Sequence, residues 1–332
     1  MTLRIPRFDR DRSPCGLRIK KLAAILFIVF NLGTLADAAQ DQSLQQKLAA
    51  LEALEGKFSF VVFGDNRSNK PVYKKFAIMA MALQPDFIVN TGDMNETPGD
   101  REQWVSFWSM SKLIDVPYFL TVGNHDISPL VPSSEQVYKE QVDLPGNELF
   151  YSFEAGNSLF VVLDSYLDGQ ERKVTGNQLK WLEDVLAKAD KKKHLFVFLH
   201  HPLYTEHRKG RHWGDCLDKF PEDRDRLQAL FVKAGVDVVF AGHEHFYQRK
   251  TVGGIEHVIT GGAGAPLYVT DGEGGFHHFV QVTVDGDLVS AEVIDRDGKV
   301  RDRFPAAPPV IEGIVSAPVS TSELVDIKQQ GR

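Results

Sequence analysis

Five short apolar runs, separated by segments with helical periodicity, constrain the fold of this 332-residue chain most strongly. The apolar runs are residues 58–63, 87–90, 118–122, 195–199 and 236–241. Apolar residues recur with helical spacing over residues 72–83, 101–113, 177–189 and 223–234. Strands that alternate with helices in this way favour an α/β domain with buried strands.

Two further regions have the pattern of antiparallel hairpins. The segment "LFYSFEAGNSLFVVLDS" is typical of two strands around a Gly156-Asn157 turn. Residues 277–300 are typical of two strands that turn at Asp285-Gly286. The sequence therefore predicts mixed β-sheets rather than a purely parallel sheet.

The N-terminus has the features of an export signal. Three basic residues precede the apolar run 22–30, and the small residues at 36–39 match the A-x-A pattern that signal peptidases cleave. We predict a signal peptide over residues 1–38 and a periplasmic or secreted mature protein without stable membrane insertion. The alternative is an uncleaved N-terminal membrane anchor, although the apolar run is short for a membrane span.

The remainder divides into three predicted parts. Residues 39–56 have the pattern of a short helical linker, and residues 57–305 contain the strands and helices of the main domain. Residues 306–332 are rich in Pro, Ala, Ser and Val without periodicity, which is typical of a flexible tail.

Charge and cysteine content exclude some functions. The whole chain carries −7, and residues 1–38 contain seven Lys or Arg and three Asp or Glu, a net +4, so the mature chain carries about −11. This acidic balance argues against binding to long nucleic acids. Cys15 lies in the predicted signal, so Cys216 is left without a partner for an internal disulfide. We expect Cys216 to be an uninvolved thiol, because the sequence identifies no base to activate it.

Residue types that bind metal ions follow each of the five apolar runs. In chain order they are Asp65, Asp93, the triplet Asn124-His125-Asp126, the pair His200-His201, and His243 with His245. Sites assemble at the carboxyl ends of strands in α/β sheets, and glycines there let the loops turn tightly. Carboxylate and imidazole ligands together suit Zn, Mn or Fe rather than Ca, and a shared carboxylate could bridge two ions.

Each of these elements has a simpler interpretation on its own. Gly-Asp after a strand is commonly a turn, and His-His-Pro is commonly a loop. The Gly-His-Glu-His segment is a stronger signal, because residues 243 and 245 project to the same side of an extended chain. Five coincidental turns explain the whole set poorly, so we interpret it as one dinuclear metal site.

The order of these residues resembles the calcineurin-like metallophosphoesterase superfamily over roughly residues 57–300. Residues 260–266, "TGGAGAP", are similar to its purple acid phosphatase-like branch. The resemblance implies two mixed β-sheets packed face to face with flanking helices, a four-layer sandwich. It also implies hydrolysis of phosphate mono- or diesters by a hydroxide that two metal ions activate.

The resemblance assigns a role to each matching residue. One ion, called the second ion, would be bound by the second-ion residues Asp93, Asn124, His200 and His243. The other, called the first ion, would be bound by the first-ion residues Asp65, Asp93 and His245. Asp93 would therefore bridge both ions. His125, backed by Asp126, would lie at the leaving group as general acid.

Arg67 departs from the family pattern. That pattern begins Asp-x-His, with the histidine on the first ion, but here Asp65 and Asn66 are followed by arginine, which cannot ligate a metal ion. In the purple acid phosphatase-like branch, a tyrosine three residues after the bridging aspartate takes that place, and Glu96 occupies this position here. We predict that Glu96 or a water completes the first ion's ligands, with Asn66 and Asn95 as weaker candidates.

Arg67 also has two interpretations of its own. Its guanidinium matches two phosphate oxygens, so it is a candidate for substrate binding. The alternative is a structural arginine paired with an aspartate. A basic stretch adds weaker candidates for substrate contact, namely His207, Arg208, Arg211 and His212.

The sequence therefore predicts an exported metal-dependent phosphoesterase that acts on a phosphorylated small molecule or another phosphoester. A nuclease or a cyclic-nucleotide phosphodiesterase is an alternative within the same class. A catalytically inactive metal-binding module, tolerated because Arg67 replaces a ligand, is an alternative of another class.

Overall fold

The computed structural model describes residues 41–189, 193–206 and 215–305. The predicted signal over 1–38, the predicted tail over 306–332 and the basic residues His207, Arg208, Arg211 and His212 lie outside the described residues. None of the helices within these described residues has the length and apolar composition that a membrane span requires.

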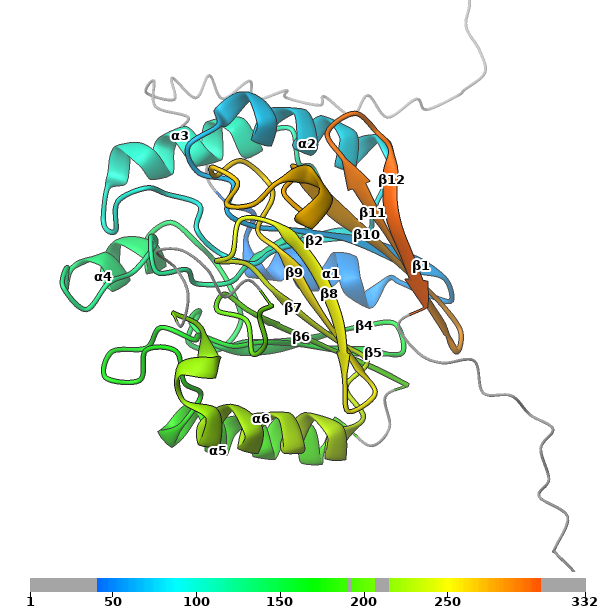
Figure 1. Cartoon of the computed structure of the whole chain (residues 1–332). Coiled ribbons are helices and arrows are strands. Elements are labelled where there is room, and N and C mark those ends of the chain that lie inside the picture. Colours follow the sequence, from blue (N-terminus) through cyan, green and yellow to red (C-terminus); the bar gives the residue numbers. More distant parts are fainter. Residues whose placement is uncertain (1–40, 190–192, 207–214, 306–332) are drawn as a thin grey trace, which may run out of the picture. The chain divides into compact units, whose positions relative to one another are not determined.

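Two six-stranded mixed sheets form the centre of the fold (Figure 1). The first has the order β12 (Val300–Pro305), β11 (Leu288–Asp295), β10 (His278–Asp285), β1 (Phe58–Phe63), β2 (Phe87–Asn90) and β3 (Tyr118–Leu120). The second has the order β4 (Tyr151–Ala155), β5 (Ser158–Val162), β6 (His194–Leu199), β7 (Val238–Ala241), β9 (Ile255–Thr260) and β8 (Tyr247–Val252). Strands β1 to β3 are parallel, as are β5, β6, β7 and β9, and the other pairings are antiparallel. The prediction of mixed sheets is confirmed.

Helices cover the outer faces of both sheets (Figure 1). They are α2 (Lys70–Ala82) and α3 (Arg101–Ser111) on the first sheet, and α5 (Gly176–Ala187) and α6 (Pro221–Ala234) on the second. In α2 the buried residues Tyr73, Phe76, Ala77 and Ala80 recur every three or four positions, so one stripe of the helix faces the sheet. The predicted four-layer sandwich is confirmed.

Aromatic rings fill the space between the two sheets. The Phe60 ring of β1 lies 5.3 Å from the Phe160 ring of β5 and 5.2 Å from the Phe196 ring of β6, each centroid to centroid. Phe87 of β2 stacks on Phe60 at 5.1 Å. Edge-to-face and offset contacts of this kind add stability beyond the area they bury. The two sheets are therefore held in a fixed relation at the level of β1, β2, β5 and β6.

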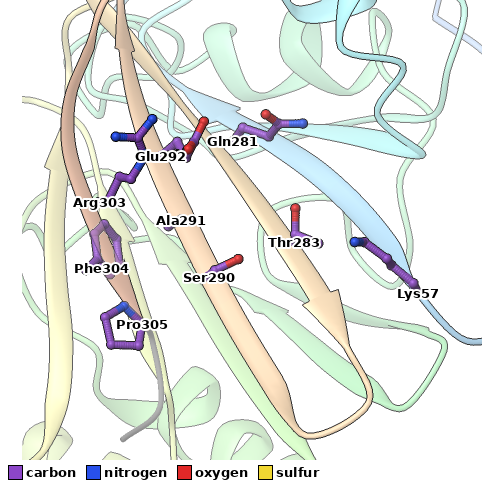
Figure 2. Close-up of a pocket in the computed structure, with 9 residues that line it drawn as sticks. All are labelled: Lys57, Gln281, Thr283, Ser290, Ala291, Glu292, Arg303, Phe304 and Pro305. Carbon is purple, nitrogen blue, oxygen red and sulfur yellow. Dashed lines mark hydrogen bonds and ion pairs between the residues drawn. The ribbon is translucent and has the colours of Figure 1, made fainter. Parts of the chain in front are cut away.

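The outer face of β10, β11 and β12 is polar. Gln281 and Thr283 alternate with buried valines along β10, as expected for a strand with one solvated face. Figure 2 shows these side chains together with Ser290, Glu292 and Arg303. They line a concavity of about 480 Å³. This face contains none of the predicted site residues.

Several elements differ from the sequence prediction. Helices α2 and α6 each begin two residues earlier than predicted, because a proline in the first turn is compatible with a helix start. The β10–β11 turn consists of Gly286-Asp287, one residue later than predicted, since Asp285 still pairs with Leu288. The hairpin β8–β9, strand β12 and helix α4 (Ser134–Lys139) were not predicted.

Helix α1 (Leu44–Glu52) lies in the segment predicted as a short helical linker. It begins with a capping box in which Ser43 and Gln46 each satisfy a backbone N–H of the other. Its Lys47 side chain is fully buried, forms an ion pair with Asp41 at 2.5 Å and donates to the Asp143 carbonyl. These contacts bind α1 to the main domain, so this segment is part of the domain's packing.

Candidate metal centre

Strand ends from both sheets meet at one place and carry the predicted metal ligands. Asp65 and Asp93 follow β1 and β2 of the first sheet, whereas His200 and His243 follow β6 and β7 of the second. All four side chains are buried. Donor atoms of Asp65, Asp93 and His200 lie within 4.8 Å of one another, as do those of His200, His201 and His243. The fold thus joins ligand types that are distant in sequence.

Three of these residues have an uncommon backbone conformation. The φ angles of Asp65, Asp93 and His243 are 55°, 61° and 67°. Non-glycine residues in this left-handed region are uncommon and cost free energy, so they cluster where function requires a particular side-chain direction. The conformation directs both carboxylates and the His243 ring into the space between the strand ends.

Two glycines allow the loops to approach the carboxylates. A Cβ on Gly123 would lie 2.2 Å from Asp93 Oδ1, and a Cβ on Gly242 would lie 2.5 Å from Asp65 Oδ2. Both distances are far below contact, so no other residue fits without moving the carboxylates. These glycines keep the two loops tight against the candidate ligands.

The second-ion residues present donor atoms at close mutual distances. Asn124 Oδ1 lies 3.1 Å from His200 Nε2 and 3.0 Å from His243 Nδ1. His200 Nε2 also lies 3.3 Å from Asp93 Oδ1. Ligands at about 2.0–2.2 Å from one ion stand roughly 3.0–3.5 Å apart in tetrahedral or octahedral geometry. The donor set and its spacing therefore fit a metal ion.

Backbone carbonyls orient two of the imidazole rings. His200 Nδ1 lies 2.8 Å from the Thr91 carbonyl oxygen, and His245 Nδ1 lies 2.7 Å from that of Pro266. A carbonyl only accepts, so each Nδ1 carries a proton and each Nε2 presents its lone pair. Metal-binding histidines are commonly fixed in this way.

The first-ion residues are also close together, but Arg67 lies among them. His245 Nε2 lies 3.3 Å from Asp65 Oδ1. Arg67 Nε donates to Asp93 Oδ2 at 3.2 Å, and its Nη2 lies 3.4 Å from His245 Nε2. Burial alone would raise the pKa of Asp93, but its electrostatic interactions with His200, His125 and Arg67 outweigh burial and lower that pKa. Asp93 is therefore ionised and shared between both groups of residues.

Glu96 has a different partner from the one predicted. Arg67 Nη1 donates to Glu96 Oε2 at 2.7 Å, and the Ser68 hydroxyl donates to Glu96 Oε1. Burial tends to raise the pKa of Glu96, but the Ser68 hydrogen bond and the Arg67 charge lower it. The carboxylate that was expected to complete the first ion's ligands thus binds the arginine. The weaker candidate Asn66 uses its Oδ1 to accept from Asn90.

The prediction that Asp126 backs the His125 ring is wrong. The Asp126 carboxylate accepts backbone N–H groups of Gly123, Asp93 and Met94 at 2.8–2.9 Å. His125 Nδ1 instead lies 2.7 Å from the carbonyl oxygen of Glu96. The physical reason is burial: Asp126 turns inward, where it satisfies the N–H groups of two tight loops. Asp126 therefore positions the Asp93 and Asn124 loops.

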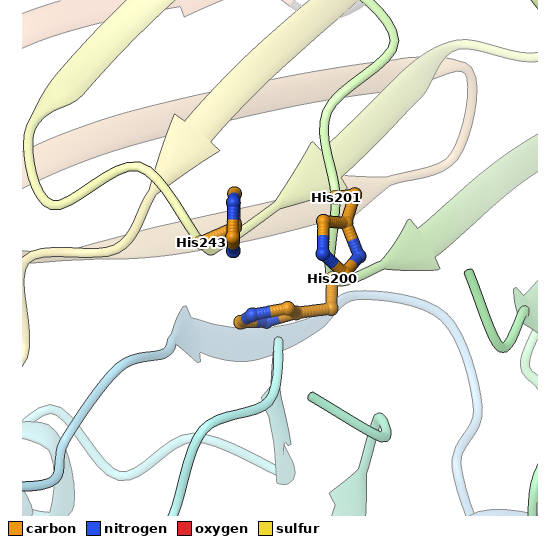
Figure 3. Close-up of side chains that lie close together, drawn as sticks. All are labelled: His200, His201 and His243. Carbon is orange, nitrogen blue, oxygen red and sulfur yellow. The ribbon is translucent and has the colours of Figure 1, made fainter. Parts of the chain in front are cut away.

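The structure also brings His201 into the site, a residue that the sequence analysis named beside His200 but to which it assigned no role. His201 lies with its ring centroid 4.2 Å from that of His243, and Figure 3 shows the rings of His200, His201 and His243 close together. Ser165 Oγ accepts the His201 N–H at 3.0 Å and lies 2.9 Å from His201 Nδ1. Burial and the neighbouring rings of His243 and His200 lower the pKa of His201 well below its usual value, so its ring is neutral. The sequence signal for His201 was its position next to His200, directly after a strand.

Tyr268 was also missed. Its ring stacks on that of His245 at 4.2 Å, and its hydroxyl lies 3.3 Å from His245 Nε2. Tyr268 lies two residues after the "TGGAGAP" segment, where no apolar run or glycine marked it. Tyr268 therefore lies against the His245 ring, beside the first-ion residues.

Cys216 is a buried free thiol. Its Sγ lies 3.5 Å from Glu244 Oε1, and burial together with the Glu244 charge raises its pKa well above the usual value. The thiol therefore stays protonated and is a poor nucleophile, in line with the expectation from the sequence.

Asp164, two residues after β5, gives a prediction for stability. The side chain is buried, and burial raises its pKa from 3.8 to about 7. Between about pH 4 and 7 the native state binds more protons than the unfolded chain, so the free energy of unfolding falls as pH rises. Asp164→Asn should remove this fall, which is at most about 4 kcal/mol. Urea unfolding at several pH values measures it. The exposed Asp168→Asn variant should keep the wild-type slope, and an unchanged slope in Asp164→Asn would show that Asp164 titrates normally.

Comparisons with known proteins identify the family that has this arrangement. The sequence model of calcineurin-like phosphoesterases matches residues 58–247, more than half of the chain. Purple acid phosphatase 23 of Arabidopsis thaliana is 32% identical over 169 residues, which cover 48% of this chain and 34% of that protein. Serine/threonine-protein phosphatase CPPED1 of Homo sapiens is 30% identical over 203 residues, which cover 58% of this chain and 63% of that protein. The chain thus spans less than two thirds of the length of these relatives.

Solved structures share the fold. Purple acid phosphatase PPD1 from yellow lupin superposes with a TM-score of 0.63 at 22% identity, covering 76% of this chain and 54% of that chain. GAP50, described as the anchor in the inner membrane complex of Plasmodium, superposes with a TM-score of 0.58 at 14% identity, covering 75% of this chain and 88% of that chain. Because the family match covers the strand ends that hold the candidate ligands, the chain belongs to the calcineurin-like phosphoesterase family, and its relatives place it in the purple acid phosphatase-like branch.

Proposed function

We propose that this chain is a metal-dependent phosphoesterase that hydrolyses phosphate mono- or diesters. One observation carries the proposal: Asn124 Oδ1 lies within about 3.1 Å of both His200 Nε2 and His243 Nδ1. One amide oxygen and two imidazole nitrogens thus converge beside the ionised Asp93. The named phosphatases among its relatives support the same reaction class.

Asp93, Asn124, His200 and His243 would hold the second ion. Their oxygen and imidazole donors suit Fe, Mn or Zn. When bound, such an ion lowers the pKa of a water and stabilises the charge that develops on a phosphoryl group. A two-ion mechanism, as the family resemblance implies, would additionally require Asp65 and His245, which together with Asp93 are the first-ion residues.

His125 would donate the proton to the leaving group. Its Nδ1 donates to the Glu96 carbonyl oxygen, and its backbone N–H donates to Asp93 Oδ1 at 3.0 Å. The ring is thereby fixed next to Asp93, with Nε2 left to carry the proton that the leaving oxygen takes. A general acid is most useful when the leaving group is poor.

A cavity beside the site would receive the organic part of the ester. It has a volume of about 320 Å³, and its lining includes Arg67, Lys70, Gln103, Phe107 and Met110. Two cationic side chains next to apolar ones suit a small phosphorylated molecule with an apolar portion. The substrate-binding role of Arg67 is part of this proposal, since the residue joins the cavity to the site.

We propose export to the periplasm or the exterior, on the basis of the predicted signal in residues 1–38. The N-terminal residue of the mature protein, read by Edman degradation, tests this: a start at about residue 39 supports cleavage, and an intact N-terminus supports a retained anchor.

A second candidate, a metal-binding module without catalysis, has a specific observation in its favour. Arg67 contacts Asp93, Glu96 and His245, three residues predicted to bind the first ion. A centre that holds fewer than two ions can bind metal without hydrolysing a substrate. Hydrolysis by the purified chain separates the two candidates.

Metal removal tests the proposed function. Chelator treatment of the purified full chain should abolish hydrolysis of an aryl phosphate monoester and diester, and Mn²⁺, Zn²⁺ or Fe²⁺ should restore it. His200→Ala should stay inactive after metal addition, because it loses a second-ion donor. The matched control is His257→Gln, a buried histidine of β9 outside the site, which should behave as wild type. Activity that persists without metal would contradict the proposal.

A further inference from the structure

The guanidinium of Arg67 lies where the first ion would bind. Nε donates to Asp93 Oδ2 at 3.2 Å, Nη1 donates to Glu96 Oε2 at 2.7 Å, and Nη2 lies 3.4 Å from His245 Nε2. One guanidinium nitrogen thus faces each of three residues predicted for the first ion. The remaining one, Asp65, contributes a favourable charge interaction with Arg67.

The guanidinium and an ion exclude each other from this position. An ion would have to come within about 2.0–2.2 Å of the same oxygen and nitrogen atoms. The lone pairs of these atoms already accept hydrogen bonds from the guanidinium. The Arg67 side chain is only 11% exposed, so it is held within the site rather than extended into solvent. A second positive charge a few ångströms away in a buried site would add strong repulsion. The first-ion residues therefore do not fit an ion while Arg67 is in place.

The charge balance of the site explains why an arginine is kept there. Asp65 and Asp93 are both buried, and a buried carboxylate needs a compensating cation. A family member with histidine at this position would leave that compensation to a metal ion. Arginine supplies it permanently, because its guanidinium stays protonated at any relevant pH.

We propose that Arg67 replaces the first metal ion, so that this chain has a one-ion centre with a fixed guanidinium as its second cation. This inference rests on the proposed function, which places the ion at Asp93, Asn124, His200 and His243. In this centre Glu96 is a positioning residue, because it holds Nη1 while Ser68 holds the other carboxylate oxygen.

Metal content tests the inference. Wild-type protein, equilibrated with excess Mn²⁺ or Zn²⁺ and freed of unbound metal, should contain one ion per chain by elemental analysis. Arg67→His restores the family's Asp-x-His pattern and should raise the content to two. Arg67→Lys, the matched control, keeps a positive charge and should stay at one. Arg67→Met removes the charge at similar side-chain length and should raise the content above one, which keeps the test informative if Arg67→His folds poorly.

Two results would overturn the inference: two ions in the wild type, or one ion in both Arg67→His and Arg67→Met. Failure of the proposed function gives a different pattern. A wild type that binds one ion, gains a second through Arg67→His and hydrolyses no ester would sustain the role of Arg67 and refute the phosphoesterase.

Discussion

Replacing His125 by alanine should lower kcat for an alkyl phosphate ester by about 10²–10⁴-fold. The reason is that His125, whose ring Nδ1 donates to the Glu96 carbonyl and whose backbone N–H donates to the Asp93 carboxylate, is the proposed proton donor to the leaving oxygen. An aryl ester with a good leaving group needs little protonation, so its kcat should fall much less. Metal content should be unchanged, because the ring is not among the second-ion donors.

The measurement is kcat for a matched pair of alkyl and aryl phosphates. The half-buried His277, whose Nδ1 lies 2.9 Å from the Gly262 carbonyl oxygen, provides the control variant His277→Ala, which should keep both rates. Equal losses for the two leaving groups in His125→Ala would contradict the general-acid role and point to a role in substrate binding.

Replacing Asp93 by asparagine should remove both the bound metal and the activity. Asp93 is the ionised residue that meets His200 on one side and Arg67 on the other. A bound ion supplies several kcal/mol of stabilisation to the transition state, so its loss should lower kcat/KM by at least about 10³-fold. Arg67 would also lose one of its two carboxylate partners, which should weaken the native state.

Elemental analysis and kcat/KM on the same preparation test this prediction, with thermal unfolding as a measure of stability. Asp115→Asn, an exposed aspartate between α3 and β3, makes the same chemical change away from the site and should have no effect. Wild-type metal content in Asp93→Asn would show that the ion binds elsewhere.

The sequence was sufficient to predict much of the fold and the grouping of ligands. Apolar runs such as 58–63 and 195–199 are long and uninterrupted, so strands β1 and β6 follow from hydrophobicity alone. The hairpin β8–β9 was missed because its first strand, "YQRKTV", is polar and only partly buried at the edge of the sheet. Strand β8 forms because it pairs with β9 across the Gly253-Gly254 turn. Its formation therefore depends on tertiary context rather than on local propensity.

The details of the site depended on information that the sequence pattern does not contain. Arg67 and Glu96 are brought together by the register of β1 and β2, in which Phe63 pairs with Asn90. Nothing in the local sequence shows that the guanidinium turns toward Asp93 and not toward solvent. Similarly, Asp126 and His125 are neighbours in sequence, but only the loop geometry shows that Asp126 faces buried N–H groups instead of the ring.

The most direct test of the account is the initial rate of phosphoester hydrolysis by the purified full chain, measured as a function of metal occupancy. The rate should rise in proportion to bound metal and reach its plateau at one ion per chain, with His200→Ala inactive throughout. A chain that fills with metal and releases the alcohol or phenol from neither a monoester nor a diester would contradict this expectation, and would identify the protein as a metal-binding module built on a phosphoesterase fold.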